Sequence, residues 1–164
     1  MRRRENSTQA KGYDAVIFTP VGRIGVMLEN DALADVSFLS EKTTLHAPRT
    51  TATKKVCRQL RSYFANSRYT FRLLLTLSGT PFQQRVWRAL RRIPAGRTLS
   101  YGALASKLAT SARAVGNACR ANPVPIVIPC HRIVAANGVG GFMGKRSGSA
   151  LRIKHRLLEH EHSG

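Results

Sequence analysis

The sequence predicts an α+β protein, in which a small N-terminal α/β lobe precedes a mostly helical C-terminal domain. Two patterns predict this class. Short runs rich in valine and isoleucine, separated by turn residues, fill most of the first forty positions. Beyond residue 80, apolar residues recur at helical spacing instead. The length of 164 residues and the hydrophobic share of 43% suit one domain, or two small lobes that share an interface.

The N-terminal lobe is expected over residues 13–78. It follows a polar and basic segment, residues 1–12, that we expect to be disordered. Runs rich in valine and isoleucine, joined by a turn at 20–22, predict strands over residues 14–19 and 23–29. A turn at Asn30 and Asp31 leads into a third predicted strand over 33–39, and a fourth is predicted over 69–76. A loop over 40–52 should lead into one helix between the third and fourth strands. The apolar positions of this helix are Val56, Leu60, Tyr63 and Phe64.

The C-terminal domain, residues 79–164, is expected to begin with a well-capped helix. Thr80 suits the N-cap, Pro81 suits the first helical position, and Gln83 completes a capping box. The apolar stripe of this helix consists of Phe82, Val86, Leu90 and Ile93. The boundary between the two parts of the chain should therefore lie just before Thr80.

A helix-turn-helix is predicted over residues 100–121. Ser100 can cap a first helix over 101–108, and a tight turn at 109–111 leads into a second helix over 112–121. The inward residues of the second helix should be Ala112, Val115 and Cys119. Its opposite, basic face should carry Arg113, Gly116, Asn117 and Arg120. An ordinary helical hairpin with a solvated basic face fits this pattern about equally well, but the charge of the whole chain favours DNA.

The charge balance points to a polyanionic partner. The chain has 27 lysines and arginines against 8 acidic residues, a formal charge of +19, and such a surface repels itself without counterions. Nucleic acid is the favoured partner; a membrane surface or simple solubility are the alternatives. No apolar run approaches the ~20 residues that a membrane span needs. Three cysteines without a CxxC pair favour free thiols in a reducing cytoplasm over a disulfide frame or a structural metal.

Cys130 is the candidate nucleophile. It lies beside His131 in the motif Pro129–Arg132, which directly follows the apolar run Ile126–Ile128. That run is expected to be a buried strand. A buried thiol is usually inert, whereas a thiolate is a strong nucleophile. The last helix should begin near Ser149, with inward residues Ala150, Ile153, Leu157 and Leu158.

Glu161 falls on the same inward face of that last helix, where a carboxylate needs a partner. His131 is the candidate partner, which would give a thiol, a proton acceptor and an orienting carboxylate. The alternative is that Glu161 lies in solvent at a frayed helix end. Glu159, the rival carboxylate, points to the opposite face from Leu157 and Leu158.

Several motifs together resemble the methylated-DNA–protein-cysteine methyltransferases, the O6-alkylguanine-DNA alkyltransferases. These motifs are Thr80–Trp87, Ser100–Gly102, Arg113–Gly116 and Asn122–Arg132. The resemblance is dense over residues 80–144 and returns at Leu157–Glu161. It implies a ribonuclease-H-like N-terminal lobe and a stoichiometric DNA repair protein that acts as a monomer, without a cofactor or an obligate protein partner.

The resemblance also implies a mechanism. Cys130 would attack the alkyl carbon on O6 of a guanine flipped out of duplex DNA, and would keep the alkyl group permanently. Arg113 would fill the space in the stack, Tyr101 would donate to the base, and Asn122 would tie down the preceding segment. His131, through a water, and Glu161 would take the thiol proton. The DNA-binding residues it implies are Tyr101, Arg113, Ala114, Gly116, Asn117 and Arg120. The base pocket it implies is formed by Ile133, Phe142 and Met143, with backbone groups of Cys130.

Two departures from the family pattern stand out. Phe142 lies where a tyrosine is common, and residues 145–148 form an insertion before the last helix. Two other functions compete with alkyl transfer. A non-catalytic protein that binds alkylated DNA would lack the reactive cysteine, and a Cys-His hydrolase would give no reason for the basic helix-turn-helix. The resemblance leaves open whether O4-alkylthymine is a substrate.

Overall fold

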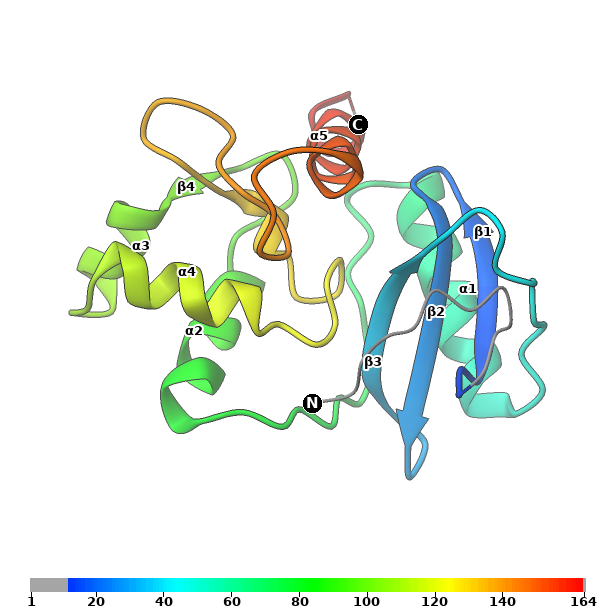
Figure 1. Cartoon of the computed structure of the whole chain (residues 1–164). Coiled ribbons are helices and arrows are strands. Elements are labelled where there is room, and N and C mark those ends of the chain that lie inside the picture. The colour runs from blue at the N-terminus through cyan, green and yellow to red at the C-terminus, as the bar shows by residue number, and fades with distance from the viewer. Residues whose placement is uncertain (1–11, 164) are drawn as a thin grey trace. The chain divides into compact units, whose positions relative to one another are not determined.

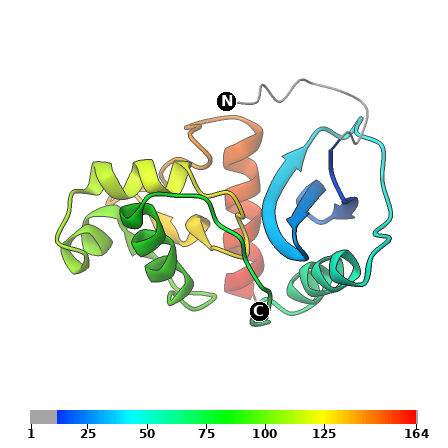
Figure 2. The ribbon, with the colours of Figure 1, turned by 90° about the horizontal axis from the view of Figure 1, so that it is seen from below.

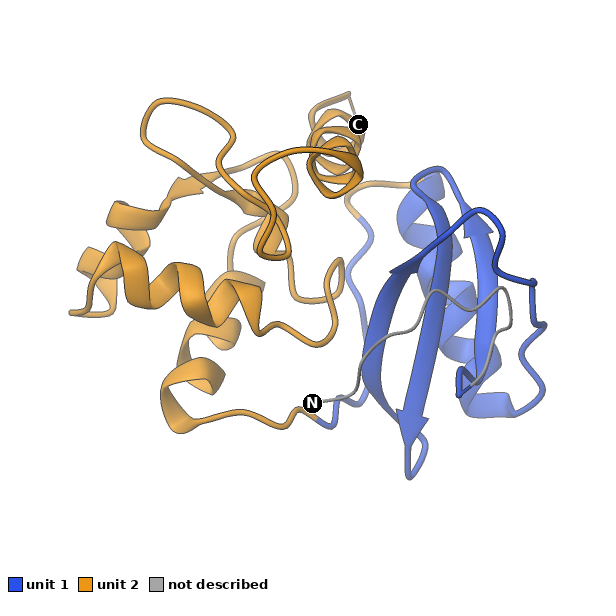
Figure 3. Cartoon of the chain, viewed as in Figure 1, with its two compact units in different colours: residues 1–65, 69–76 blue, residues 66–68, 77–164 orange. Residues whose placement is uncertain are grey.

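The computed structural model describes residues 12–163 (Figure 1). The expected disorder of residues 1–12 therefore concerns a segment that, apart from Gly12, lies outside the described residues. The chain divides into two compact units (Figure 3). The first comprises the chain up to residue 65 together with 69–76, and the second comprises 66–68 and everything from residue 77. The fold is mixed α/β.

The first unit is built on a three-stranded antiparallel sheet in the order β1-β2-β3. The strands are β1 (Ala15–Thr19), β2 (Gly22–Glu29) and β3 (Ala32–Leu39), which confirms the three strands predicted before residue 40. The β2–β3 turn consists of Asn30 and Asp31, both with positive φ (49° and 65°). This conformation matches the twist of paired strands and is tolerated best by glycine, asparagine and aspartate.

Helix α1 (Thr51–Ala65) packs against β1 and closes the core of this unit (Figure 1). Its inward face is the one that the four-residue spacing predicts, and it buries Val56, Cys57, Leu60 and Tyr63. Phe64, at the edge of that face, is only half-buried. The lysines and arginines of α1 are thereby turned outward.

The strand predicted over residues 69–76 is wrong. Leu75 alone makes a bridge, to Leu33 of β3. Upstream, the Gln59 side chain of α1 takes the place of a neighbouring strand: it accepts from the Arg72 amide (2.9 Å) and donates to the Arg72 carbonyl (3.2 Å). Because a side chain satisfies these backbone groups, the segment stays extended without joining a ladder.

The second unit begins with α2 (Pro81–Arg91), whose predicted capping box is present. Thr80 accepts from the Gln83 amide, and the Gln83 side chain accepts from the Thr80 amide. The predicted stripe omitted Trp87, which is fully buried and donates from Nε1 to the Ala118 carbonyl (2.9 Å). Gly79 makes room for this ring, since a Cβ there would lie 2.5 Å from it.

Helices α3 (Tyr101–Lys107) and α4 (Ala112–Arg120) form a tight pair. Ser100 caps α3, as predicted. Ser111, for which no capping role was predicted, caps α4 through the Ala114 amide (3.1 Å). One expectation for α4 is wrong. Ala112 is exposed because it forms part of a pocket wall, and the inward residues are Val115, Ala118 and Cys119.

The buried strand predicted over Ile126–Ile128 is also wrong. The residues are buried, but the segment is a tight turn in which Ile126 has a φ of +75° and the Ile128 amide donates to the Val124 carbonyl (2.9 Å). Cys130 then opens a short 3-10 helix, η1 (Cys130–Arg132). A two-residue strand follows at once, β5 (Ile133–Val134), which pairs in parallel with β4 (Leu99–Ser100).

The last helix, α5 (Ser149–Ser163), begins at the predicted residue and packs against η1 (Figure 2). Its most buried residues are Lys154, Leu157 and Glu161, which share one face; Ala150, Ile153 and Leu158 are half-buried. Two charged side chains therefore lie inside the second unit. Over residues 12–163, no helix has the length and apolar character that crossing a membrane requires.

Candidate active site

A pocket of about 1130 Å³ lies within the second unit. One wall is the exposed face of α4 and another is the loop of residues 139–146. The remaining lining residues are Tyr101, Cys130, Ala135, Leu151 and His155. Eight of the predicted site residues border it: Tyr101, Arg113, Gly116, Asn117, Arg120, Cys130, Phe142 and Met143. The sequence motifs that were scattered over forty residues thus converge on one cavity.

Cys130 is 5% exposed and lines this pocket. Burial raises the pKa of its thiol to about 11, although a hydrogen bond with Asn122 and the charge of Lys154 both lower it. The group is therefore a neutral thiol at neutral pH, and its reaction requires a neighbour that takes the proton.

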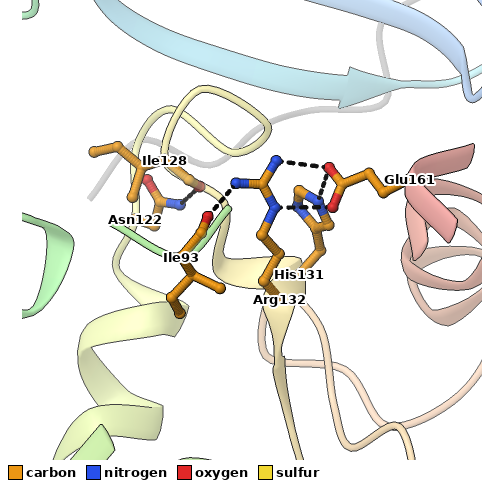
Figure 4. Close-up of polar contacts among 6 residues, drawn as sticks. All are labelled: Ile93, Asn122, Ile128, His131, Arg132 and Glu161. Atoms are coloured by element: carbon orange, nitrogen blue, oxygen red, sulfur yellow. Dashed lines mark hydrogen bonds and ion pairs between the residues drawn. The ribbon is translucent and has the colours of Figure 1, made fainter. Parts of the chain in front are cut away.

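Asn122 holds the turn that precedes Cys130 (Figure 4). Its side-chain oxygen accepts from the Val124 amide (3.0 Å), and its side-chain nitrogen donates to the Ile128 carbonyl (2.8 Å). One buried amide thus satisfies both ends of an irregular apolar segment. The position of the Cys130 backbone depends directly on this side chain.

Glu161 reaches from α5 to η1 and meets two consecutive residues there (Figure 4). Its Oε2 lies 2.8 Å from His131 Nε2, and Arg132 donates to both carboxylate oxygens at 2.8 Å. Arg132 also donates to the Ile93 carbonyl (2.5 Å). Glu161 is 4% exposed, whereas Glu159 is exposed. The helix phase therefore selected the correct one of the two carboxylates.

His131 is fully buried, and the two nitrogens of its ring differ. Nε2 is taken by Glu161, while Nδ1 has no hydrogen-bond partner among the described residues. Burial lowers the pKa of His131 below its ordinary value of 6.5, although Glu161 raises it. In the neutral ring, an Nε2–H that donates to the carboxylate leaves Nδ1 as a hydrogen-bond acceptor.

Lys154 is fully buried on the face of α5 that also carries Glu161, two turns later. Its ammonium donates to three backbone carbonyls: Ile133 (2.7 Å), Val139 (2.7 Å) and Gly141 (2.8 Å). Burial lowers its pKa to about 8, and attraction to the Cys130 and Cys119 thiolates raises it. Lys154 therefore links the pocket loop to β5 through hydrogen bonds. Its positive charge acts on the thiols of Cys119 and Cys130.

The pocket loop also packs on Tyr101. Gly140 has a φ of +76°, and a Cβ there would lie 3.2 Å from the Tyr101 ring and 3.0 Å from the Ala135 amide nitrogen. Beyond it, Phe142 and Lys145 exchange two backbone hydrogen bonds (2.8 and 2.9 Å) around a tight turn. Burial raises the pKa of Tyr101 to about 12, so its hydroxyl remains a proton donor at neutral pH.

The cations of α4 lie on the outer wall of the pocket. Arg113, Asn117 and Arg120 are exposed, as predicted, and Gly116 lies against the Tyr101 ring. Arg120 also runs beside Gly144 of the pocket loop, where an added Cβ would lie 3.2 Å from its Nε. Ala114 does not border the pocket.

Three predicted site residues lie outside the pocket lining, and two residues that hold the site together were not predicted. Asn122, His131 and Glu161 lie outside its lining, and the carbonyl of Ile133, also outside it, accepts from Lys154. The two unpredicted contributors are Arg132 and Lys154. The phase that placed Glu161 inward also places Lys154 inward, so the signal was available. Among residues 12–163, no cluster of three histidine, cysteine or acidic side chains could hold a metal ion.

Residues 81–163 match the family model described as 6-O-methylguanine DNA methyltransferase, DNA binding domain. The methylated-DNA–protein-cysteine methyltransferase of Methanosarcina acetivorans is 37% identical over 158 residues, which cover 92% of this chain and 99% of that protein. The constitutive enzyme of the same name from Bacillus subtilis is 38% identical over 161 residues, covering 91% and 94%.

Solved structures show the same similarity. The crystal structure of Mycobacterium tuberculosis OGT in complex with DNA aligns with a TM-score of 0.76 and 36% identity. The alignment covers 90% of this chain and 92% of that one. The similarity thus extends over both units and not only over the part that contains Cys130. The chain belongs to the methylated-DNA–protein-cysteine methyltransferase family.

Proposed function

We propose that this protein repairs duplex DNA by transferring the alkyl group of O6-alkylguanine to Sγ of its own Cys130. The observation that carries the proposal is the environment of Cys130: a neutral thiol lines a large pocket, next to a buried histidine whose Nε2 is held by Glu161. In the transfer, an S–C bond forms, the C–O bond breaks, and the bonding electrons remain on the guanine oxygen.

The thiol proton needs an acceptor before or during this attack. His131 Nδ1 is the acceptor we assign, acting through one water molecule, because Nε2 is occupied by Glu161. Glu161 stabilises the imidazolium that forms, and Arg132 holds the carboxylate in place from its other side. Lys154 favours the Cys130 thiolate, whose pKa its charge lowers.

The departing guanine also requires a proton or a strong hydrogen bond. Tyr101 is the donor we assign, because its hydroxyl is un-ionised at neutral pH and its ring lines the pocket. We assign Phe142 and Met143, which also line the pocket, as a wall of the base pocket. A wall of apolar and glycine residues can contact the flat face of a base, and it does not select for one particular alkyl group.

The target atom reaches a buried thiol only if the nucleotide leaves the stack, at a cost of a few kcal/mol. We assign α3 and α4 as a helix-turn-helix that positions the duplex, with Arg113 filling the vacated space. Arg113 is exposed at the start of α4 and borders the pocket. Contacts mainly to phosphates suit repair at any sequence. The antiparallel sheet and single helix of the first unit support its assignment as ribonuclease-H-like.

The product is a thioether, which has no good leaving group, and the neighbouring thiol in the pocket lining, Cys119, is buried and un-ionised. Each chain should therefore react once. The added alkyl group also occupies a packed site, so the product should be less stable than the free protein.

Mass spectrometry tests the proposal directly. Incubation with a duplex that contains O6-methylguanine should add one methyl group per chain and restore guanine in the DNA. The Cys130→Ala variant should bind the same duplex and gain no mass. An unmodified wild-type protein, or more than one guanine restored per chain, would overturn the proposal.

A further inference from the structure

The exposed side of α1 carries a second concentration of positive charge, in the first unit and separate from the pocket. Four side chains form it: Lys54, Lys55, Arg58 and Arg61. All four are exposed, and their spacing of three and four residues places them on neighbouring turns of one helix. We call this set the α1 basic face. The opposite side of α1 packs into the core of the unit, and this packing keeps the α1 basic face turned toward solvent.

Among residues 12–163, no acidic group pairs with the α1 basic face. Between Glu41 and Glu159 the sequence contains neither aspartate nor glutamate. Among the described residues, none of the four side chains makes an ion pair or a side-chain hydrogen bond. Like charges at this spacing destabilise a helix, so the arrangement costs stability in the free protein.

The location of the lysines within α1 adds to this cost. Lys54 and Lys55 lie near the N-terminus of the helix, where the macrodipole is positive and acidic residues are favoured. The first turn contains no acidic residue. The exposed side of α1 thus has like charges three and four residues apart, and lysines near the positive end of the helix dipole. Such unfavourable features on an exposed face, next to a regular buried face, are typical of a binding surface.

We infer that the α1 basic face binds the phosphate backbone of duplex DNA, as a contact surface additional to α4. Phosphate oxygens would neutralise the repulsion along the face and the positive end of the helix dipole at the same time. Duplex DNA is favoured over a lipid surface because α1 exposes no large apolar side chain that could enter a bilayer; the exposed ones of the described residues are Phe18, Leu45 and Leu74. Two linked contact surfaces raise the effective concentration of DNA at each.

The inference rests on the proposed function in one respect, that the polyanion is DNA. The test therefore measures DNA binding and alkyl transfer separately. The test variant combines Lys54→Gln, Arg58→Gln and Arg61→Gln. The control variant combines Lys42→Gln, Arg49→Gln and Arg97→Gln, which removes the same charge from exposed positions elsewhere. Glutamine suits a helix as well as lysine does, so the test variant should fold, which its circular dichroism and melting temperature can verify.

Binding to an undamaged 40-base-pair duplex is measured over a range of salt concentrations. Each phosphate contact contributes about 0.9 to the slope of log K against log salt. The test variant should therefore lose about 2 to 3 from the slope, and the control variant less than 1. Equal slopes for the two variants would overturn the inference, as would a difference that appears only with anionic lipid vesicles. Benzyl transfer from a free O6-benzylguanine base should be unchanged in both variants; loss of this reaction would count against the proposed function and not against the α1 basic face.

Discussion

Cys119 and Cys130 line the same pocket, yet their surroundings differ. Cys119 lies in the last turn of α4, and Cys130 opens η1. Both thiols are buried, at 7% and 5% exposure. Burial raises the pKa of both: to about 11 for Cys130, and still further for Cys119, where the neighbouring Cys130 also raises it. Access to the pocket therefore does not distinguish the two thiols.

The neighbours of the two thiols do distinguish them. Cys130 has a hydrogen bond with Asn122 that favours its thiolate, and it precedes a histidine whose ring is held by Glu161. For Cys119, the one influence that lowers the pKa is the charge of Lys154, which Cys130 shares. A thiol in a pocket becomes an acceptor only where hydrogen-bonding groups stabilise its anion and a base takes its proton.

The largest effect should come from removing the carboxylate that only Cys130 uses. Glu161→Gln removes the negative charge that His131 and Arg132 both contact. Single-turnover methyl transfer should therefore slow by about 100-fold, within the range of general-base effects. Stability should fall by about 3 kcal/mol, because a buried pair loses one charge. Rates from rapid quenching, at a temperature where the variant is folded, check this.

Glu159→Gln is the matched control for Glu161→Gln, since Glu159 lies two residues earlier on the exposed side of α5. It should leave both rate and stability unchanged. Comparable losses in the two variants would mean that the charge of the C-terminal helix matters, and not the contact with His131.

A smaller effect should follow from the change that both thiols share. Lys154→Met keeps the length of the side chain but removes its charge and its donors to three carbonyls. Transfer should slow by about tenfold, and the alkylation of Cys119 and Cys130 by iodoacetamide should fall together, because the same charge lowers both pKa values. A fall at Cys130 alone would show that Lys154 acts only by positioning the pocket loop.

The smallest effect concerns His131, the assigned proton acceptor, and how protein stability depends on pH. Since burial lowers the pKa of His131 below 6.5, the folded protein binds fewer protons than the unfolded chain at acidic pH. Stability should therefore fall as pH decreases below 6.5, by at most about 1.4 kcal/mol per pH unit from this group. Urea unfolding between pH 7.5 and 5.5 measures it, and His162→Gln, which removes an exposed histidine, should not alter the slope. A flat profile would mean that His131 is not held neutral.

Sequence patterns predicted the elements whose signals are local. The three N-terminal strands, the capping box at Thr80 and the inward position of Glu161 follow from alternation, capping chemistry and helix phase. The prediction failed where distant side chains satisfy the backbone. Asn122 turns an apolar run into a loop, and Gln59 keeps the segment around Arg72 out of a sheet.

Lys154 was missed for a different reason. Helix phase places Lys154 on the inward face, but a lysine on an apolar helix face usually extends its charge to solvent. The three carbonyls that accept from its ammonium are visible only in the three-dimensional structure. Arg132 is similar, because its partners come from α5 and from the end of α2. Hydrogen bonds between distant segments leave no periodic trace in the sequence.

Locating the transferred methyl group among the three buried thiols tests the central claim most directly. After reaction with one equivalent of the O6-methylguanine duplex, the wild-type protein is digested and its cysteine peptides are identified by mass. The methyl group should lie on Cys130 alone, and Cys119→Ala should react at nearly the wild-type rate. Methylation of Cys119, in the wild-type protein or in Cys130→Ala, would contradict the claim that Asn122, His131 and Glu161 select the acceptor.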